Sequence, residues 1–354
     1  MNTLLLMALV ACSDKGDDSG PLDDTSSDTT GTPGTTTDDS GTDDTGPVEP
    51  GMELLANNIE AGALLSAWSN GDELIFAGGE ISGAGGGYYV RYDGSSFCYE
   101  ADVADRAFWW IHGAAEGDWY AVGERGLILH HTGGEHVDES VPTDVTLYGA
   151  FDEGDRTWAV GGDASKSTGE IWVREAGVWS LAHTGDGPFF KAWCDGEGSC
   201  LFNGAFTSWA VEGDRTNGYE PSPAPDAHLL TCRGRDWTDV WCVGGTSGSE
   251  VWRWDGSAWS EADASGLGQP LMGVWTAPGE DVWVSGMSAI VGVWDGSAWT
   301  VDIPVAIEPF HATWKHGDDF FFAGGNLTTT SGDFYGTIGH YGQPLGTQDV
   351  TACP

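Results

Sequence analysis

A short apolar segment ending in glycine recurs seven times along this chain. The segments are IFAGG, WYAVG, WAVGG, CLFNG, WCVGG, WVSG and FFAGG. Their first glycines are Gly78, Gly123, Gly161, Gly204, Gly244, Gly286 and Gly324, at spacings of 45, 38, 43, 40, 42 and 38 residues. Stretches such as VWCVGG are apolar at successive positions, which indicates strands that are buried on both faces. A recurrence of this length is typical of a repeat architecture.

Each repeat unit contains sequence for four strands. An apolar segment precedes the glycine, as in LLSAW ending at Trp68 and LMGVW ending at Trp275. A third strand and a turn follow, as in RWDGSAW, where Asp-Gly suits a type I′ turn with positive φ at both residues. Trp179, Trp259 or Trp299 then begins a fourth strand. Seven such sheets bury their faces by closing into a ring, so we predict an all-β, seven-bladed β-propeller.

Composition supports an all-β fold and narrows the possible partners. The 354 residues include 55 Gly and 19 Trp, which suit many turns and flat, packed strand surfaces. The formal net charge is −42, from 55 acidic and 13 basic residues. Such a surface repels phosphate backbones, so nucleic acid is not an expected partner. Cationic proteins, divalent cations and neutral glycans fit better, although acidity also simply keeps an exported protein soluble.

The chain begins with a short apolar stretch, LLLMALVA, that ends directly at Cys12. A membrane-spanning helix needs about 20 apolar residues, so this length suits the core of a signal peptide instead. Leu9, Val10, Ala11 and Cys12 together resemble the bacterial lipobox. The resemblance implies a signal peptide over residues 1–11 and a lipid on the Cys12 sulfur. An ordinary signal peptide in which Cys12 is incidental is the alternative.

Residues 12–50 form the next predicted segment, a disordered tether that begins at the lipidated cysteine. It is almost wholly Asp, Thr, Ser, Gly and Pro, so no apolar burial offsets the entropy of ordering it. Its average span is roughly 35 Å. Ser13 resembles the residue that follows the cysteine in outer-membrane lipoproteins of Gram-negative bacteria. The resemblance implies a cell-envelope protein, periplasmic or surface-facing, with its propeller over residues 51–354.

The repeat itself is similar to known propeller repeats. The GG ending followed by a Trp-led strand resembles the kelch repeat, and the DGSAW turn resembles the sialidase-type (BNR) repeat. The resemblance covers about residues 62–350 and implies propeller architecture. The units are shorter than typical kelch repeats and lack complete Asp boxes, so neither resemblance assigns one family.

Four of the cysteines are placed by the repeat. Cys194 and Cys200 lie 10 and 4 residues before the glycine of their unit, and Cys232 and Cys242 lie 12 and 2 residues before theirs. Both pairs of offsets have the same sum, as opposed residues of an antiparallel hairpin do. Opposed residues lie within disulfide reach, so we predict the bonds Cys194–Cys200 and Cys232–Cys242.

The last two cysteines are predicted to close the ring. Cys98 falls in the fourth strand of the first unit, and Cys353 is expected near the end of the outer strand of the seventh. These units are neighbours in a ring, so a Cys98–Cys353 bond is possible. Oxidation is expected in an exported protein with an even number of these cysteines. No CxxC spacing occurs, and neither a metal site nor a cofactor is predicted.

Four residues are candidates for binding. His112, Lys191 and Arg233 fall on innermost strands, where they border the ring axis. A structural role is the competing interpretation for His112, and a buried carboxylate partner or an anionic ligand are equal alternatives for the two cations. Trp237 lies in what we expect to be a long, exposed loop, where a Trp suits a partner contact.

The sequence favours binding over catalysis. It contains no G-x-S-x-G, HExxH or P-loop motif, and no motif groups three of its arginines as a sialidase-like site requires. We therefore expect a monomeric, membrane-anchored, non-enzymatic binding or scaffolding module for a protein or glycan. One version resembles the propeller lipoprotein of outer-membrane barrel assembly. The alternative is a carbohydrate-active propeller enzyme, a glycoside hydrolase or lyase.

Overall fold

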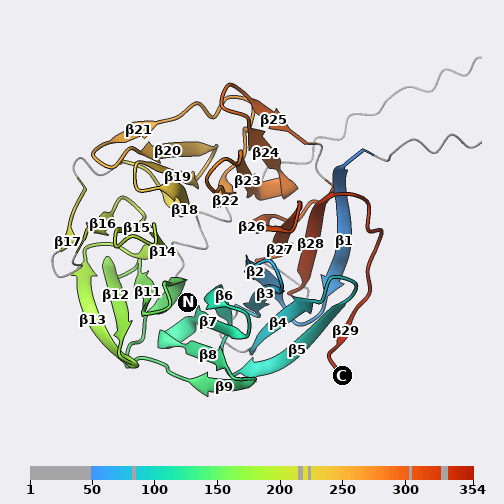
Figure 1. Ribbon diagram of the computed structural model, residues 1–354, viewed down its shortest axis with the longest axis horizontal. Helices are drawn as coiled ribbons and strands as arrows, with labels where there is room; N and C mark the ends of the chain where they lie inside the picture. Colours follow the sequence, from blue (N-terminus) through green and yellow to red (C-terminus); the bar gives the residue numbers. More distant parts are fainter. Residues whose placement is uncertain (1–48, 82–84, 214–217, 222–224, 303–304, 328–333) are drawn as a thin grey trace, which may run out of the picture.

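The strands of this chain form seven separate sheets arranged in a ring, seen down the ring axis in Figure 1. The computed structural model describes residues 49–354 except 82–84, 214–217, 222–224, 303–304 and 328–333. The prediction of a seven-bladed β-propeller is confirmed. The predicted signal peptide and lipobox lie outside the described residues, as does almost all of the tether. No helix in the described part is long and apolar enough to cross a membrane.

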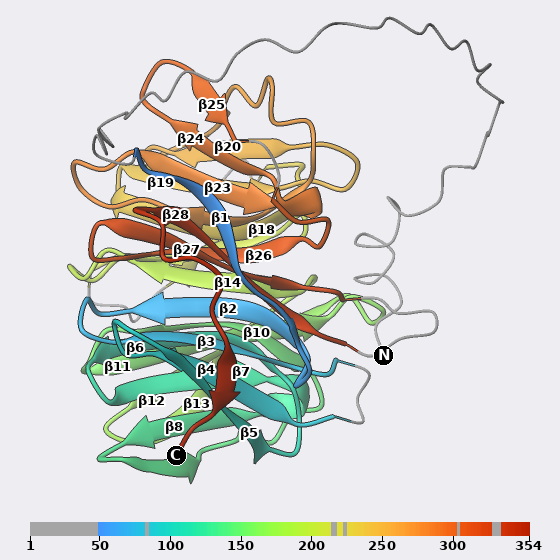
Figure 2. The ribbon, with the colours of Figure 1, turned by 90° about the vertical axis from the view of Figure 1, so that its right-hand side faces the viewer.

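Each blade has four strands that follow one another outward from the axis (Figure 1). Figure 2 shows the same ring from the side. The innermost strands are β2 (Ala63–Ser69), β6 (Phe108–Ala115), β10 (Thr146–Asp152), β14 (Phe189–Cys194), β18 (Leu229–Asp236), β22 (Leu271–Trp275) and β26 (Phe310–His316). The second strands are β3 (Leu74–Gly79), β7 (Asp118–Gly123), β11 (Arg156–Asp163), β15 (Cys200–Gly204), β19 (Asp239–Gly244), β23 (Val282–Gly286) and β27 (Asp319–Gly325). The repeated glycines thus lie at or near the ends of second strands, as predicted.

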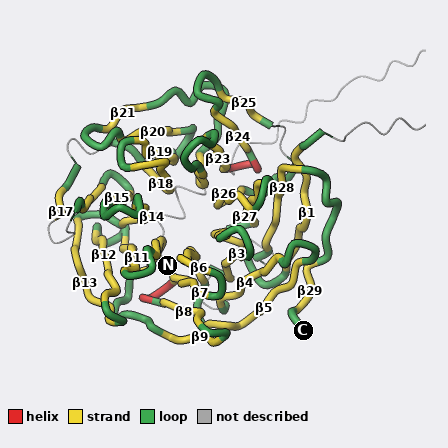
Figure 3. The backbone as a smooth tube through the Cα atoms, viewed as in Figure 1, coloured by secondary structure: helices red, strands yellow, loops and turns green. Residues whose placement is uncertain are grey.

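The outer half of each blade follows the same order. The third strands are β4 (Gly87–Tyr92), β8 (Ile128–Thr132), β12 (Thr168–Glu175), β16 (Ser208–Val211), β20 (Glu250–Trp254), β24 (Val291–Trp294) and β28 (Gly336–Gly342). The outermost strands are β5 (Phe97–Ala104), β9 (Glu135–Asp138), β13 (Val178–Gly185), β17 (Gly218–Tyr219), β21 (Trp259–Glu261), β25 (Trp299–Val301) and β1 (Gly51–Ile59). Two short 3₁₀ turns, η1 (Glu124–Gly126) and η2 (Met287–Ala289), follow β7 and β23 (Figure 3).

The ring closes through its N-terminal strand. β1 pairs with β28 and so completes blade seven, whose other strands come from the opposite end of the sequence. The fully buried His340 ring joins the two ends: its Nδ1 is 2.8 Å from the Glu53 carboxylate on β1, and its Nε2 is 3.2 Å from the Asp319 carboxylate on β27. β1 therefore closes the ring in two ways: it pairs with β28, and its Glu53 carboxylate contacts the buried His340 ring.

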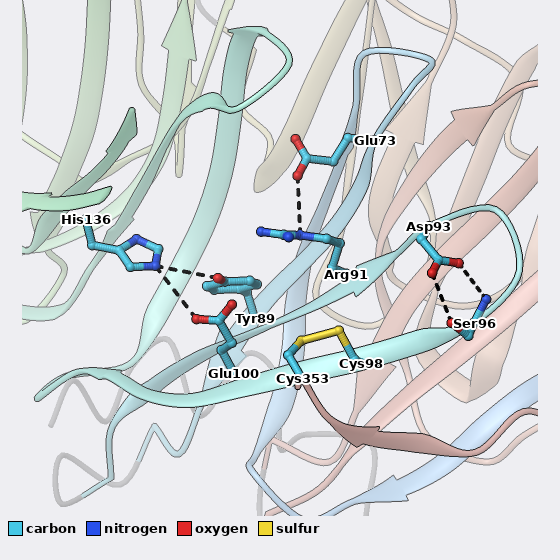
Figure 4. The surroundings of a disulfide bond; sticks show 9 residues. All are labelled: Glu73, Tyr89, Arg91, Asp93, Ser96, Cys98, Glu100, His136 and Cys353. Atoms are coloured by element: carbon cyan, nitrogen blue, oxygen red, sulfur yellow. Dashed lines mark hydrogen bonds and ion pairs between the residues drawn. A yellow bond between two sulfur atoms is a disulfide. The ribbon is translucent and has the colours of Figure 1, made fainter. Parts of the chain in front are cut away.

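The C-terminal strand closes the ring a second time, by a route that the sequence analysis assigned wrongly. β29 (Val350–Ala352) is a fifth, parallel strand on β5 of blade one, not part of blade seven. Cys353 follows it and forms the predicted disulfide with Cys98 on β5 (Figure 4). The pairing was right and the strand was wrong, because β1 already occupies the outer edge of blade seven.

The two predicted hairpin disulfides are present. Cys194 faces Cys200 across β14 and β15, and Cys232 faces Cys242 across β18 and β19. The Cα–Cα distance is 4.1 Å in each pair. This short distance is typical of opposed residues in a pair without backbone hydrogen bonds, where side chains approach most closely.

The Asp-Gly turns differ from the predicted type. In the first of them, Gly94 has a positive φ of 88° but Asp93 does not, so the turn is not type I′. The Asp93 carboxylate instead accepts hydrogen bonds from the N–H groups of Ser95 and Ser96, an Asx-type arrangement. The type I′ pattern occurs at Ala176 and Gly177, whose φ values are 49° and 81°. Aspartate here stabilises the turn through its side chain rather than its backbone.

Every innermost strand contains a β-bulge beside the repeated glycine. In blade four, Phe189 pairs with Gly204 and Lys191 pairs with the preceding residue of β15, so Phe190 is skipped. The same register shift occurs in the other six blades. A Cβ on Gly204 would lie 1.9 Å from the Pro188 carbonyl oxygen, and the six equivalent glycines face backbone oxygens at 1.9 to 2.5 Å. Glycine recurs here because the bulged strand approaches too closely for any side chain.

Candidate functional site

The seven skipped residues lie on the ring axis. We call them the bulge ring: Leu65, Trp109, Tyr148, Phe190, Leu230, Met272 and His311. All seven line one cavity of about 730 Å³, counting the space open to solvent, together with Met287 and Leu327 from neighbouring loops. Since each blade contributes one side chain, the cavity is axial. Its lining of apolar side chains with few polar groups is typical of a ligand pocket.

Lys191 supplies the ammonium group of this cavity. Its Nζ donates a hydrogen bond to the Tyr148 carbonyl oxygen at 2.5 Å and lies 4.2 Å from the centroid of the Trp110 ring. Burial lowers the pKa of Lys191 to about 7. The amino group therefore titrates near neutral pH, where an ordinary lysine is fully charged.

The two histidines of the cavity are neutral at pH 7. Burial lowers the pKa of His311 to about 4, and the nearby charge of Lys191 lowers it further, against the hydrogen bond to the Gly325 carbonyl. The pKa of His228 is also lowered by burial. Lys191 is thus the cavity-lining group whose charge changes near pH 7.

A second, narrower cavity lies one layer along the axis and shares Thr231 with the first. His112 and Arg233 line it. The Arg233 guanidinium lies 4.0 Å from the centroid of the Trp314 ring, and its Nε has no hydrogen-bond partner. Burial lowers the pKa of Arg233 to about 10. Both residues were predicted to lie beside the axis, and both line this cavity.

His112 has the contacts of a structural histidine. Its Nδ1 accepts a hydrogen bond from the Asp152 backbone N–H at 3.0 Å, and its ring stacks on Phe151 with centroids 4.2 Å apart. Burial, helped by the charge of Arg233, lowers the pKa of His112 to about 3. The imidazole is therefore neutral at pH 7 and connects blades two and three.

Trp237 lies at the other end of β18 and is not in a long loop. Asp236 pairs with Asp239, so the connection to β19 is a tight turn. The Trp237 indole packs edge-on against Trp254 with centroids 5.8 Å apart, and its Nε1 donates to the Glu212 carboxylate at 2.9 Å. Trp237 is only partly exposed because it covers the outer strands of its blade.

The rim of the axial cavity carries an exposed aromatic side chain. Phe206, between β15 and β16, is 62% exposed and has a positive φ of 57°. Its N–H donates to the Ala227 carbonyl oxygen, which fixes the loop against the start of blade five. A rim cavity beside Phe206 shares Phe190 and His228 with the axial cavity. The bulge ring and Phe206 therefore form one continuous face.

Comparisons with known proteins agree on the architecture. No protein family and no curated protein matches the sequence. Among solved structures, YCF48 bound to D1 peptide is 14% identical with a TM-score of 0.61, covering 86% of this chain and 99% of that one. The WD40 β-propeller domain of Doa1 is 11% identical with a TM-score of 0.61, over 84% and 98% of the chains. YCF48 from Cyanidioschyzon merolae is 14% identical with a TM-score of 0.59, over 82% and 98%.

The likeness is to the fold alone. At these identities the match fixes the propeller and does not carry over a ligand or an activity.

The bulge ring was not predicted from the sequence. Lys191 is the immediate neighbour of a ring residue, yet the seven positions were not recognised as a set. Aligning the units on their glycines would place all seven in one column, early in the innermost strand. Their residue types differ, so only the position, and not the chemistry, repeats.

Proposed function

We propose that this chain is a non-enzymatic, membrane-anchored, extracytoplasmic scaffold that binds a segment of another protein on the face of the bulge ring. The observation that carries the proposal is the continuity of the axial cavity with the exposed Phe206. The positive φ recurs two residues after the repeated glycine, at Arg125 and Ser288, and so belongs to the fold, whereas the exposed aromatic ring at this position is particular to Phe206. Exposed aromatic and Met side chains around a pocket are typical contacts of a protein partner.

A propeller of the same fold supports this proposal. The solved structure of YCF48 contains a bound D1 peptide, so a ring of this kind accommodates a polypeptide. The strongly acidic composition of the present chain favours a partner with cationic surroundings, which would be steered toward it by charge. A glycan partner is the competing outcome of the experiment below.

Site-specific photo-crosslinking tests whether a protein partner binds the face formed by the bulge ring and Phe206. A benzophenone amino acid at Leu230 in the ring, and in a second variant at Phe206 on the rim, is expected to form the same protein adduct in the native cells. The same amino acid at Trp237, at the opposite end of β18, is the matched control and should form none. Phe206→Asp should remove most of the Leu230 adduct. Adducts only at Trp237, or adducts that contain no polypeptide, would contradict a protein partner on this face.

The lipid anchor gives a separate prediction. Two or three acyl chains hold a protein on a membrane essentially permanently, since each buried CH₂ contributes about 0.8 kcal/mol. Cys12→Ser is therefore expected to move the protein from the membrane fraction to the soluble fraction, whereas Ser13→Ala leaves it in the membrane. Fractionation of cells followed by immunoblotting measures both. Membrane retention of the Cys12→Ser protein would show that something other than this cysteine holds it.

A further inference from the structure

The charge along the ring axis is the reverse of the charge of the whole protein. The chain has 55 acidic and 13 basic residues. The two axial cavities are lined by Lys191, Arg233 and three histidines, and by no Asp or Glu among the residues that the structure describes. Carboxylates appear at the rim instead, where Asp186 and Glu220 line the cavity beside Phe206.

The other basic side chains are neutralised in a different way. Eight of the described Lys and Arg residues pair with carboxylates: Arg91, Arg106, Arg156, Lys166, Arg174, Arg235, Arg253 and Lys315. Arg125 has no such partner but is exposed to water. Within the described ranges, Lys191 and Arg233 are the basic residues that are both largely buried and without a carboxylate partner. Burying an unpaired charge is costly, and this cost is what lowers the pKa of both groups; an anionic group bound in the cavity would offset it.

The surroundings of Lys191 indicate what that partner is. Its amino group is held by one carbonyl oxygen and one aromatic face, and the walls above it are the apolar side chains of the bulge ring. One ammonium group neutralises one negative charge. A doubly charged phosphate would remain undercompensated among these apolar walls, whereas a carboxylate on an apolar body fits both the charge and the lining.

We propose that Lys191 binds a carboxylate of the partner segment, whose apolar side chains contact the bulge ring. This inference rests on the proposed function and adds the chemistry of the bound group. The carboxylate belongs either to a chain terminus or to an acidic side chain, and the experiment separates these sources. Arg233, in the second axial cavity, adds positive electrostatic potential at the Lys191 site.

Proton linkage follows from the same geometry. Tyr148 and Trp110 contact the amino group of Lys191, and His311 and His228 line the same cavity. Burial lowers the pKa of both histidines. His311 is neutral near pH 7, so the charge of the site follows Lys191, whose pKa burial lowers to about 7. A carboxylate binds the protonated amine, so affinity is expected to fall about tenfold per pH unit once the pH is well above 7.

Small model compounds test this without knowledge of the partner. N-acetyl-leucine carries a terminal carboxylate, N-acetyl-leucinamide is its neutral counterpart, and N-acetyl-glutamic acid α-amide carries the charge on the side chain. Binding is followed by tryptophan fluorescence, since Trp110 contacts Lys191 and Trp109 lines the same cavity. At least one acid is expected to bind about tenfold or more tightly than the neutral amide at pH 6. The stronger acid identifies the source of the carboxylate.

Substitution then assigns the preference to one residue. Lys191→Met should abolish the preference for acid over amide and the dependence on pH. Lys166→Met removes an exposed, ion-paired lysine and should change neither. A thermal melt verifies that both variants are folded. Equal binding of acid and amide, tighter binding of inorganic phosphate, or no binding of any compound would overturn the assignment of Lys191.

Failure of this inference can be told from failure of the proposed function. Crosslinks at Leu230 and Phe206 without any acid preference would leave the protein-binding face standing and remove the carboxylate. Loss of those crosslinks together with an intact acid preference would overturn both, because the inferred carboxylate is one carried by a partner protein on this face.

Discussion

Gly204→Ala is expected to lower the free energy of unfolding by about 3 kcal/mol or more. The added Cβ would lie 1.9 Å from the Pro188 carbonyl oxygen and 3.0 Å from the Phe189 Cα. Both are backbone atoms, which cannot rotate away. The bulge of β14 or the pairing of β14 with β15 must then give way. The effect comes from lack of space, since the repeated glycines do not have positive φ here.

The measurement is urea unfolding followed by tryptophan fluorescence. Gly248→Ala is the matched control, because a Cβ at Gly248 would meet nothing within 4 Å. That variant is expected to differ from the unchanged protein by less than about 0.5 kcal/mol. If Gly204→Ala were as stable as Gly248→Ala, the bulge would not be the reason for the repeated glycine.

Removal of the Cys98–Cys353 disulfide is the second large effect. The bond joins residues 255 positions apart, and loop-closure entropy assigns such a crosslink about 5 kcal/mol of stabilisation. Cys98→Ala with Cys353→Ala is expected to lose much of this stability. β1 still completes blade seven through β28, so the propeller should remain folded in the absence of denaturant. Limited proteolysis should then cut after β28, where β29 is no longer covalently held.

The hairpin bond Cys194–Cys200 provides the comparison. It spans 6 positions and crosslinks strands that already pair, so the same entropy argument assigns it about 2 kcal/mol. Denaturation of the two double-alanine variants side by side measures the difference. A hairpin variant less stable than the Cys98 and Cys353 variant would show that local packing, and not the closure of the ring, dominates.

The sequence was sufficient to predict the number of blades and the register of two hairpins. Both depend on local periodicity: the spacing of the glycines counts the sheets, and the equal offset sums of Cys194 with Cys200 and of Cys232 with Cys242 place opposed residues. Which residues oppose each other in a hairpin depends on their positions in that hairpin and not on the rest of the fold. The features that depend on local sequence patterns were therefore predicted correctly.

The remaining features depend on contacts between distant parts of the chain. β1 reads GMELLANNI, has no repeated glycine and gave no sign that it would pair with β28, and β29 has three residues and no pattern of its own. Trp237 was misjudged because its turn is short while its contacts with Trp254 and Glu212 come from other segments. The axial site was missed because the bulge residues have different side chains, and periodicity analysis detects similarity.

The difference between the constant glycines and the varied bulge residues has a consequence for how such a ring changes its ligand. A skipped residue has no opposite neighbour in the strand pairing, so its side chain is not selected for strand geometry. The ring already tolerates Leu, Trp, Tyr, Phe, Met and His at equivalent positions. Under the proposed function, exchanging these seven side chains would change which partner binds while leaving the architecture intact.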